Sequence, residues 1–274
     1  EAGDQRRGAG DIGAGLALII GAAVISLVSD GGSLIVPFIG EVYAWQATFL
    51  IVGLPGILIA IWVWTVKEPD RRGYIRKIVA EDGTETAVEL PVSEVIGYMG
   101  RNWKTIVPLN VCYALSAMMA YGVGAWIPTF FVRTYGWSYP QVGWWYGWII
   151  VVFGTTGVVA GGWMGDYLTS RGFRNGRMMV CALTGLAVLP FTIFFPLMGN
   201  PWMSLLLPCP STFCATCTTG AGPSALQELM PNRMRGFAAA ALIFFVSIIG
   251  LGLGPTSIAL ATDYIYGDEM MLRY

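Results

Sequence analysis

The sequence contains no histidine, and only 12% of its 274 residues are charged. Without histidine, the chain lacks the usual imidazole general base and a common ligand of zinc and haem iron, which excludes most sites built on them. Soluble domains carry about a quarter charged residues, whereas 55% of this chain is hydrophobic. The composition therefore predicts a chain that lies in a lipid bilayer.

Basic clusters and exposed cysteine pairs are also absent. An isoelectric point near 5.5 without a basic run excludes nucleic acid as a partner. The five cysteines all fall in apolar runs, which argues against a disulfide framework. Cys214 and Cys217 have the spacing of a redox motif, but packing of small residues explains them better inside an apolar run. We expect no metal and no cofactor.

Seven uncharged runs are long enough to cross about 30 Å of hydrocarbon. They span residues 12–28, 46–66, 106–131, 142–164, 178–198, 202–225 and 237–261. No Asp, Glu, Lys or Arg lies inside any of them, as the cost of placing charge in lipid requires. The sequence therefore predicts an all-α integral membrane protein with the lipid bilayer as its surroundings.

The connections between these runs carry an asymmetric positive charge. Fourteen of the 16 Lys and Arg residues fall in the alternate connections 1–11, 67–105, 165–177 and 226–236. Basic connections stay preferentially in the cytoplasm. We therefore expect loops 67–105, 165–177 and 226–236 to be cytoplasmic in a multi-pass protein of the cell membrane, the inner membrane in bacteria.

The long connection divides the chain into a two-helix part, 1–66, a central loop, 67–105, and a five-helix part, 106–274. The first part of this loop is polar and interrupted by glycine, which suits a linker. A short helix is expected after Pro91, with an apolar stripe on the membrane surface formed by Val92, Val95, Ile96 and Met99. Because both termini are polar and lack a targeting pattern, we interpret the chain as an internal piece of a longer protein.

Two runs carry a stripe of small and polar side chains at helical spacing. Asn110, Tyr113 and Tyr121 share one face of 106–131, and Ser211 and Thr218 share one face of 202–225. Such a face lines a substrate cavity or packs against another helix through its hydroxyl groups. We expect the first three residues to line a cavity and take Ser211 and Thr218 as further candidates, with most threonines serving packing.

Several stretches resemble the major facilitator superfamily of transporters, and within it the spinster-like branch and bacterial organic-acid carriers. These stretches are "WQATFLIVGLPGILIA", "VKEPDRRG", "GGWMGD" and "LQELMPNRMRG". In addition, "RRGA" before the first run and "RMRGFA" before the seventh suggest two homologous halves. The resemblance covers essentially the whole chain and implies the fifth to eleventh helices of a twelve-helix bundle, that is, seven of its twelve transmembrane helices.

The resemblance implies secondary active transport of a small organic acid or an amphipathic molecule by alternating access, without catalysis. It also implies a carrier that is monomeric at full length. The alternative is a seven-helix membrane receptor, which the helix count alone would allow. A retinal protein is excluded because no lysine lies inside a run.

The stretch "GGWMGDYLTSRGFRNGR", 161–177, matches the superfamily's loop signature through Gly162, Asp166, Arg171, Arg174 and Arg177, with Tyr167 as a departure. We expect Asp166 to face the positive N-terminus of the first helix, near Arg6 and Arg7, and to form a cytoplasmic gate. Glu228, Arg233 and Arg235 lie at the equivalent edge, and the resemblance implies that Glu228 pairs with an arginine of the loop. The alternative is an ordinary basic turn. A phosphate-binding loop is excluded because its Lys and Ser or Thr are absent.

Overall fold

The computed structural model describes residues 2–29, 34–36, 40–66, 77–79, 85–87, 91–173 and 175–267. Along the first helix, side chains are described from Ile12 to Ser26. The α-helices are α1 (Ala2–Ser29), α2 (Ala44–Trp64), α3 (Val92–Arg101), α4 (Trp103–Tyr135), α5 (Tyr139–Ile149), α6 (Thr155–Ser170), α7 (Gly176–Phe194), α8 (Pro201–Leu206), α9 (Pro208–Leu229), α10 (Arg235–Phe245) and α11 (Gly254–Leu260). Shorter π- and 3₁₀-helical segments join them: η1 (Ile150–Gly154), η2 (Phe195–Leu197), η3 (Asn232–Met234), η4 (Val246–Leu253) and η5 (Ala261–Tyr266).

Each of the seven apolar runs falls in one helical segment, because several α-helices continue through the π- and 3₁₀-helical turns. Among the described residues, the segments 103–135, 139–170, 176–197 and 232–265 are long and apolar enough to cross a membrane. Shorter apolar helices lie at 12–26 and 49–64. The segment formed by α8 and α9 is less apolar because hydroxyl groups, cysteines and prolines interrupt it.

The helices extend beyond the apolar runs and include charged residues near their ends. Helix α1 begins at Ala2, so Arg6 and Arg7 lie within it and not before it. Helix α4 likewise contains Lys104 in its first turn and Arg133 in its last. Charged residues at the ends of a membrane helix are compatible with helical structure, because water and headgroups at the interface solvate them.

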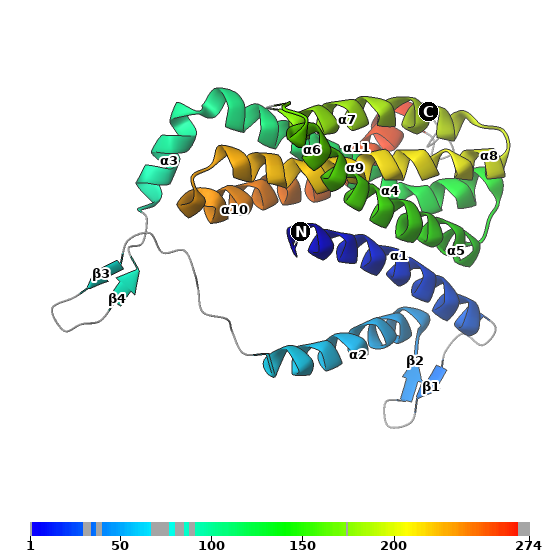
Figure 1. Cartoon of the computed structure of the whole chain (residues 1–274). Helices are drawn as coiled ribbons and strands as arrows, with labels where there is room; N and C mark the ends of the chain where they lie inside the picture. The colour runs from blue at the N-terminus through cyan, green and yellow to red at the C-terminus, as the bar shows by residue number, and fades with distance from the viewer. Residues whose placement is uncertain are drawn as a thin grey trace.

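Two short β-hairpins were not predicted. Strand β1 (Leu34–Val36) pairs antiparallel with β2 (Gly40–Val42), and β3 (Lys77–Val79) pairs with β4 (Glu85–Ala87). The second hairpin lies where a plain linker was expected, and both lie apart from the helical bundle (Figure 1). Asp82-Gly83 between two segments rich in β-branched residues is the sequence signal that indicates such a hairpin.

The long helices run side by side as one bundle (Figure 1), with α9 packed between α6 and α7 and with α4 along η4 and α11. Helix α1 lies along α5, η1 and α6, and it also contacts the start of α2 through Val24 and Ala47. The rest of α2 exposes its apolar side chains. The expected two-helix part is therefore joined to the five-helix part through α1.

The two ends of the bundle differ in their side chains. At one end, a buried cluster gathers the rings of Phe130, Phe131, Trp137 and Tyr146. At the other end, Val95 of α3 packs with residues of α9 and α10. The described arginines of 165–177 and 226–236 lie at this second end, which we call the basic end.

Helices α6 and α9 approach so closely that a side chain does not fit between them. A β-carbon at Gly161 would overlap the backbone carbonyl of Cys217. Close approach of this kind is how helices gain contact in lipid, where no hydrophobic effect drives them together. Gly161 is therefore fixed by packing rather than by backbone conformation.

We expect Gly161→Ala to lower the free energy of unfolding by about 1–3 kcal/mol, since the two helices must move apart. Gly185→Ala on α7 is the matched control because a β-carbon there meets nothing within 4 Å. The control should be neutral or slightly stabilising, as alanine favours helix over glycine. Thermal unfolding of both variants in detergent checks this, and equal stabilities would contradict the packing argument.

Candidate functional site

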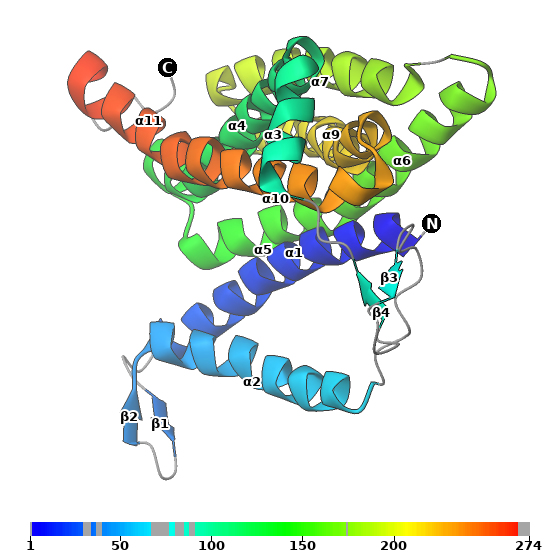
Figure 2. The same ribbon diagram turned by 90° about the vertical axis from the view of Figure 1, so that its left-hand side faces the viewer.

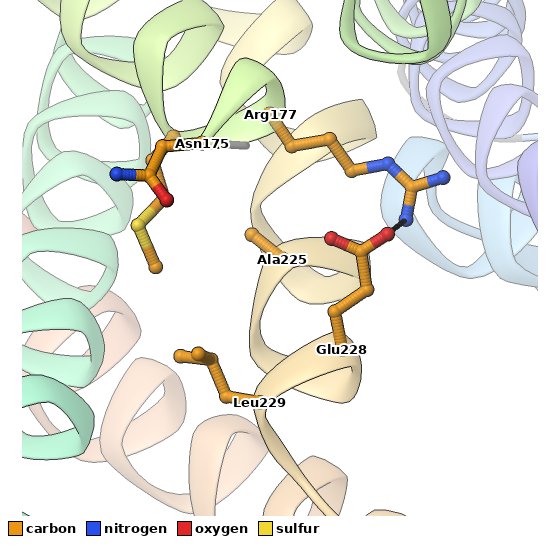
Figure 3. Close-up of a pocket in the computed structure, with 6 residues that line it drawn as sticks. Asn175, Arg177, Ala225, Glu228 and Leu229 are labelled. Atoms are coloured by element: carbon orange, nitrogen blue, oxygen red, sulfur yellow. Dashed lines mark ion pairs between the residues drawn. The ribbon is translucent and has the colours of Figure 1, made fainter. Parts of the chain in front are cut away.

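Arg177 bridges two carboxylates at the basic end of the bundle. Its Nη2 lies 2.7 Å from Oδ1 of Asp166, and its Nη1 lies 2.6 Å from Oε1 of Glu228. The three residues come from α6, α7 and α9, and Figure 3 shows the arginine reaching across to Glu228. A planar guanidinium with five donors suits this double contact. We call these three residues the Arg177 network.

Helix polarity explains why these charges need one another. Asp166 and Glu228 lie near the C-terminal ends of α6 and α9, where the helix dipole is negative. Arg177 lies in the first turn of α7, where the dipole is positive. Each charge therefore stands at the helix end that disfavours it, and the two ion pairs offset that cost. Gly172, with a φ of +90°, lets the chain turn sharply between α6 and α7.

A cavity of about 460 Å³ opens beside the network. It is lined by Asn175, Arg177, Met178, Ala225, Glu228 and Leu229. Figure 3 shows these side chains around the space between the start of α7 and the end of α9. Water or a polar group therefore has room next to the Arg177–Glu228 pair.

Tyr167, the departure from the family pattern, contacts two neighbouring side chains. The guanidinium of Arg171 lies 4.8 Å from the centre of its ring. The ring of Trp163 is nearly parallel to that of Tyr167, with 5.5 Å between the ring centres. Tyr167 thus engages Arg171 through a cation–π contact. The carboxylate of Asp166 pairs with Arg177 instead.

The remaining residues of the predicted gate are placed less closely together. Gly162 lies against α9: a β-carbon added to Gly220 of that helix would lie 3.3 Å from the backbone nitrogen of Gly162. Arg235 donates to the carbonyl of Gln227 at 3.0 Å, and Arg233 is exposed in η3. Arg174 and the side chains of Arg6 and Arg7 lie outside the described residues. Contact between Asp166 and the start of α1 therefore stays a prediction.

A second cavity, of about 440 Å³, lies in the middle of the bundle between α1 and the helices of the five-helix part. We call it the central cavity. Tyr121 and Ser211, two of the five predicted cavity residues, line it. The hydroxyl of Ser211 lies 3.2 Å from that of Thr192, which also lines the cavity. None of the described residues that line it is charged.

The other three predicted cavity residues are not among those that line the central cavity. Asn110 is 4% exposed and donates to the carbonyl of Ile106, while its own amide oxygen has no hydrogen-bond partner among the described atoms. Tyr113 packs against Gly222 of α9. The hydroxyl of Thr218 lies 3.0 Å from that of Thr184 on α7.

Sequence reasoning missed some of the residues that line this cavity. Thr192 and Tyr146 lie in strongly apolar runs, although Thr184, two turns before Thr192, was a signal that could have indicated a polar face there. Thr216 lines the cavity too, although its hydroxyl also donates to Thr212 one turn earlier. In a membrane helix, a hydroxyl can donate to the carbonyl one turn earlier while that carbonyl keeps its helical hydrogen bond. In the described part of the chain, no group of three possible metal ligands occurs.

The family model described as Major Facilitator Superfamily matches residues 8–255. The uncharacterized transporter YybO of Bacillus subtilis is 26% identical over 159 residues, which are 54% of this chain and 35% of that protein. An MFS-type efflux pump of Mycolicibacterium smegmatis is 26% identical over 155 residues, 57% of this chain and 36% of the pump. The chain thus spans about a third of the length of these curated relatives.

Two crystal structures of a bacterial homolog of the human lysosomal transporter Spinster share this fold. The inward-facing, unoccupied form superposes with a TM-score of 0.62 at 24% identity, covering 90% of this chain and 51% of that one. The inward-facing, occupied form gives 0.61 at 22% identity, covering 95% and 53%. These similarities confirm the predicted all-α, membrane-embedded fold class.

The placement of the cavity residues is testable by thiol labelling. In a background without the five native cysteines, we expect Ser211→Cys and Tyr121→Cys to react with a water-soluble methanethiosulfonate reagent. Thr218→Cys on the same helix as Ser211 should react much more slowly, because Thr218 is buried against α7. The mass shift of each purified variant measures the reaction. Faster labelling at position 218 than at 211 would contradict the assignment.

Proposed function

The chain belongs to the major facilitator superfamily, whose model matches most of its length, and from this premise we propose that it forms part of a secondary active transporter that works by alternating access. The central cavity is the observation that carries the proposal. It lies at mid-helix between α1 and the five-helix part, which is where carriers built from repeated bundles hold their substrates. Membership in a transporter superfamily disfavours the receptor alternative.

The lining of the cavity favours an amphipathic substrate over a small organic acid. Its described polar groups are hydroxyls and its remaining lining is apolar. A small carboxylate placed there would lose its hydration without gaining a cationic partner, which costs several kcal/mol or more. The apolar chain of an amphipathic molecule could instead pack against Leu18, Val123 and Leu251. Its polar group could form hydrogen bonds with the hydroxyls of the cavity.

The Arg177 network is proposed as part of a gate at the basic end, and the charge asymmetry favours the cytoplasmic side for this end. The network joins the ends of α6, α7 and α9, so these three ends move together. Asp166 remains 69% exposed and keeps acceptor capacity for a further donor. A second partner near the start of α1 would connect the two parts of the chain when this side closes.

The substrate class is tested by protection of Ser211→Cys from the same thiol reagent. We expect octan-1-ol to slow the labelling, because its chain fills the apolar part of the cavity and its hydroxyl can pair with the hydroxyls there. Acetate is the comparison, since it is a small carboxylate without the chain. Protection by acetate and not by octan-1-ol would overturn the preference for an amphipathic substrate.

Alternating access predicts that a thiol at position 211 is reachable from both membrane sides in turn. In the complete gene product, we expect an impermeant reagent to label it in right-side-out and in inside-out vesicles. Arg177→Gln should increase labelling from the basic side by weakening closure, while unfolding free energy falls by roughly 1 kcal/mol or less, as for exposed ion pairs.

Arg171→Gln is the control, because it removes an equal charge from the same connection but neither ion pair of the network. It should change labelling less than Arg177→Gln. Labelling confined to one side in both variants and in the unmodified protein would contradict alternating access.

A further inference from the structure

Helix α3 lies across the basic end of the bundle. In Figure 1 it runs transverse to the long helices, and Figure 2 shows it in front of the ends of α4, α9 and α10. Because the long helices cross the membrane, a helix placed transverse to their ends runs along the membrane surface. This helix belongs neither to the central cavity nor to the Arg177 network.

One side of α3 is fixed to the bundle. Val95 is 2% exposed and packs in a cluster with Leu226 and Met230 of the α9 end. The hydroxyl of Tyr98 donates to the carbonyl of Leu229 at 3.0 Å, a group left without a helical partner at the end of α9. The orientation of the helix about its own axis is therefore set by these contacts.

The adjoining side of α3 carries apolar side chains that nothing in the described structure covers. Ile96 is 64% exposed, and Val92, one turn earlier, is also exposed. Trp103, at the start of α4, is 56% exposed. Arg101 and Lys104, both exposed, flank this tryptophan. Exposed apolar side chains on a short helix, with basic side chains and a tryptophan near its C-terminal end, are typical of helices that lie in a membrane interface.

We propose that Val92, Ile96, Arg101, Trp103 and Lys104 form a docking surface for anionic phospholipid on the basic side of the membrane. Val92 and Ile96 insert among the upper acyl groups, Trp103 lies at headgroup depth, and the two cations contact the lipid phosphate. The bilayer that surrounds α4 continues directly onto this surface. The lipid contact does not depend on the proposed transport function.

The experiment measures lipid binding to the purified full chain by native mass spectrometry, with phosphatidylglycerol and phosphatidylcholine in competition. We expect the unmodified chain to retain phosphatidylglycerol preferentially. Because each surface cation adds about fivefold in affinity for anionic lipid, Arg101→Gln with Lys104→Gln should lower that preference by about thirtyfold.

The matched control exchanges the two cations, as Arg101→Lys with Lys104→Arg, and should keep the preference because the charge is conserved. Ile96→Ser should weaken binding of both lipids without changing their ratio. Thermal unfolding of each variant shows that the fold is retained.

Equal phosphatidylglycerol binding by the neutralised variant would overturn the proposal. So would loss of the preference in the charge-conserving variant, which would indicate a local structural effect. Unchanged lipid binding in Ile96→Ser would show that the exposed apolar side of α3 does not contact lipid, and this too would overturn the proposal. None of these results bears on transport, so the two proposals fail independently.

Discussion

Hydrocarbon cannot solvate charge, and this one constraint determines where the charged groups of the chain are found. The seven apolar runs are free of charged residues, so the polar chemistry inside the bundle is left to hydroxyls and amides. Most of the described hydroxyls there bond to a carbonyl one turn earlier in their own helix. The charges gather at the helix ends, where they hold neighbouring helices in register through contacts such as those of Arg177.

At the basic end, two kinds of contact therefore hold the helices together. The Arg177 network joins α6, α7 and α9 through side chains, and Tyr98 joins α3 to the carbonyl of Leu229 directly after Glu228. Ion pairs near the surface add little stability. The burial of Val95 and the hydrogen bond of Tyr98 contribute more. At this end, a weakly stabilising ion-pair network therefore lies beside a packing contact that stabilises the fold more strongly.

The helices were predictable because an uncharged apolar run long enough to cross a bilayer has few possible structures other than a membrane helix. Their ends were not, since the part of α1 before position 12 contains Asp4, Arg6, Arg7 and Asp11 and is still helical. The polar stripe of α4 shows a second limit. Asn110, Tyr113 and Tyr121 share a face by periodicity, but that face is long enough to meet several neighbours, and only Tyr121 reaches the central cavity. Periodicity identifies a common face and does not identify the helix or cavity that lies opposite it.

The crossing of α1 and α5 has a consequence for how the chain can diversify. A β-carbon on Gly147 would lie 3.0 Å from the carbonyl oxygen of Gly15, and one on Gly15 would lie 2.8 Å from that of Gly147. Neither position can accept a side chain while the other helix stays in place, so the two glycines cannot vary independently. Leu16, directly beside the crossing, is exposed and is free to change among apolar residues. Substitutions in α1 are thus expected on the exposed face of the helix and not on the face that crosses α5.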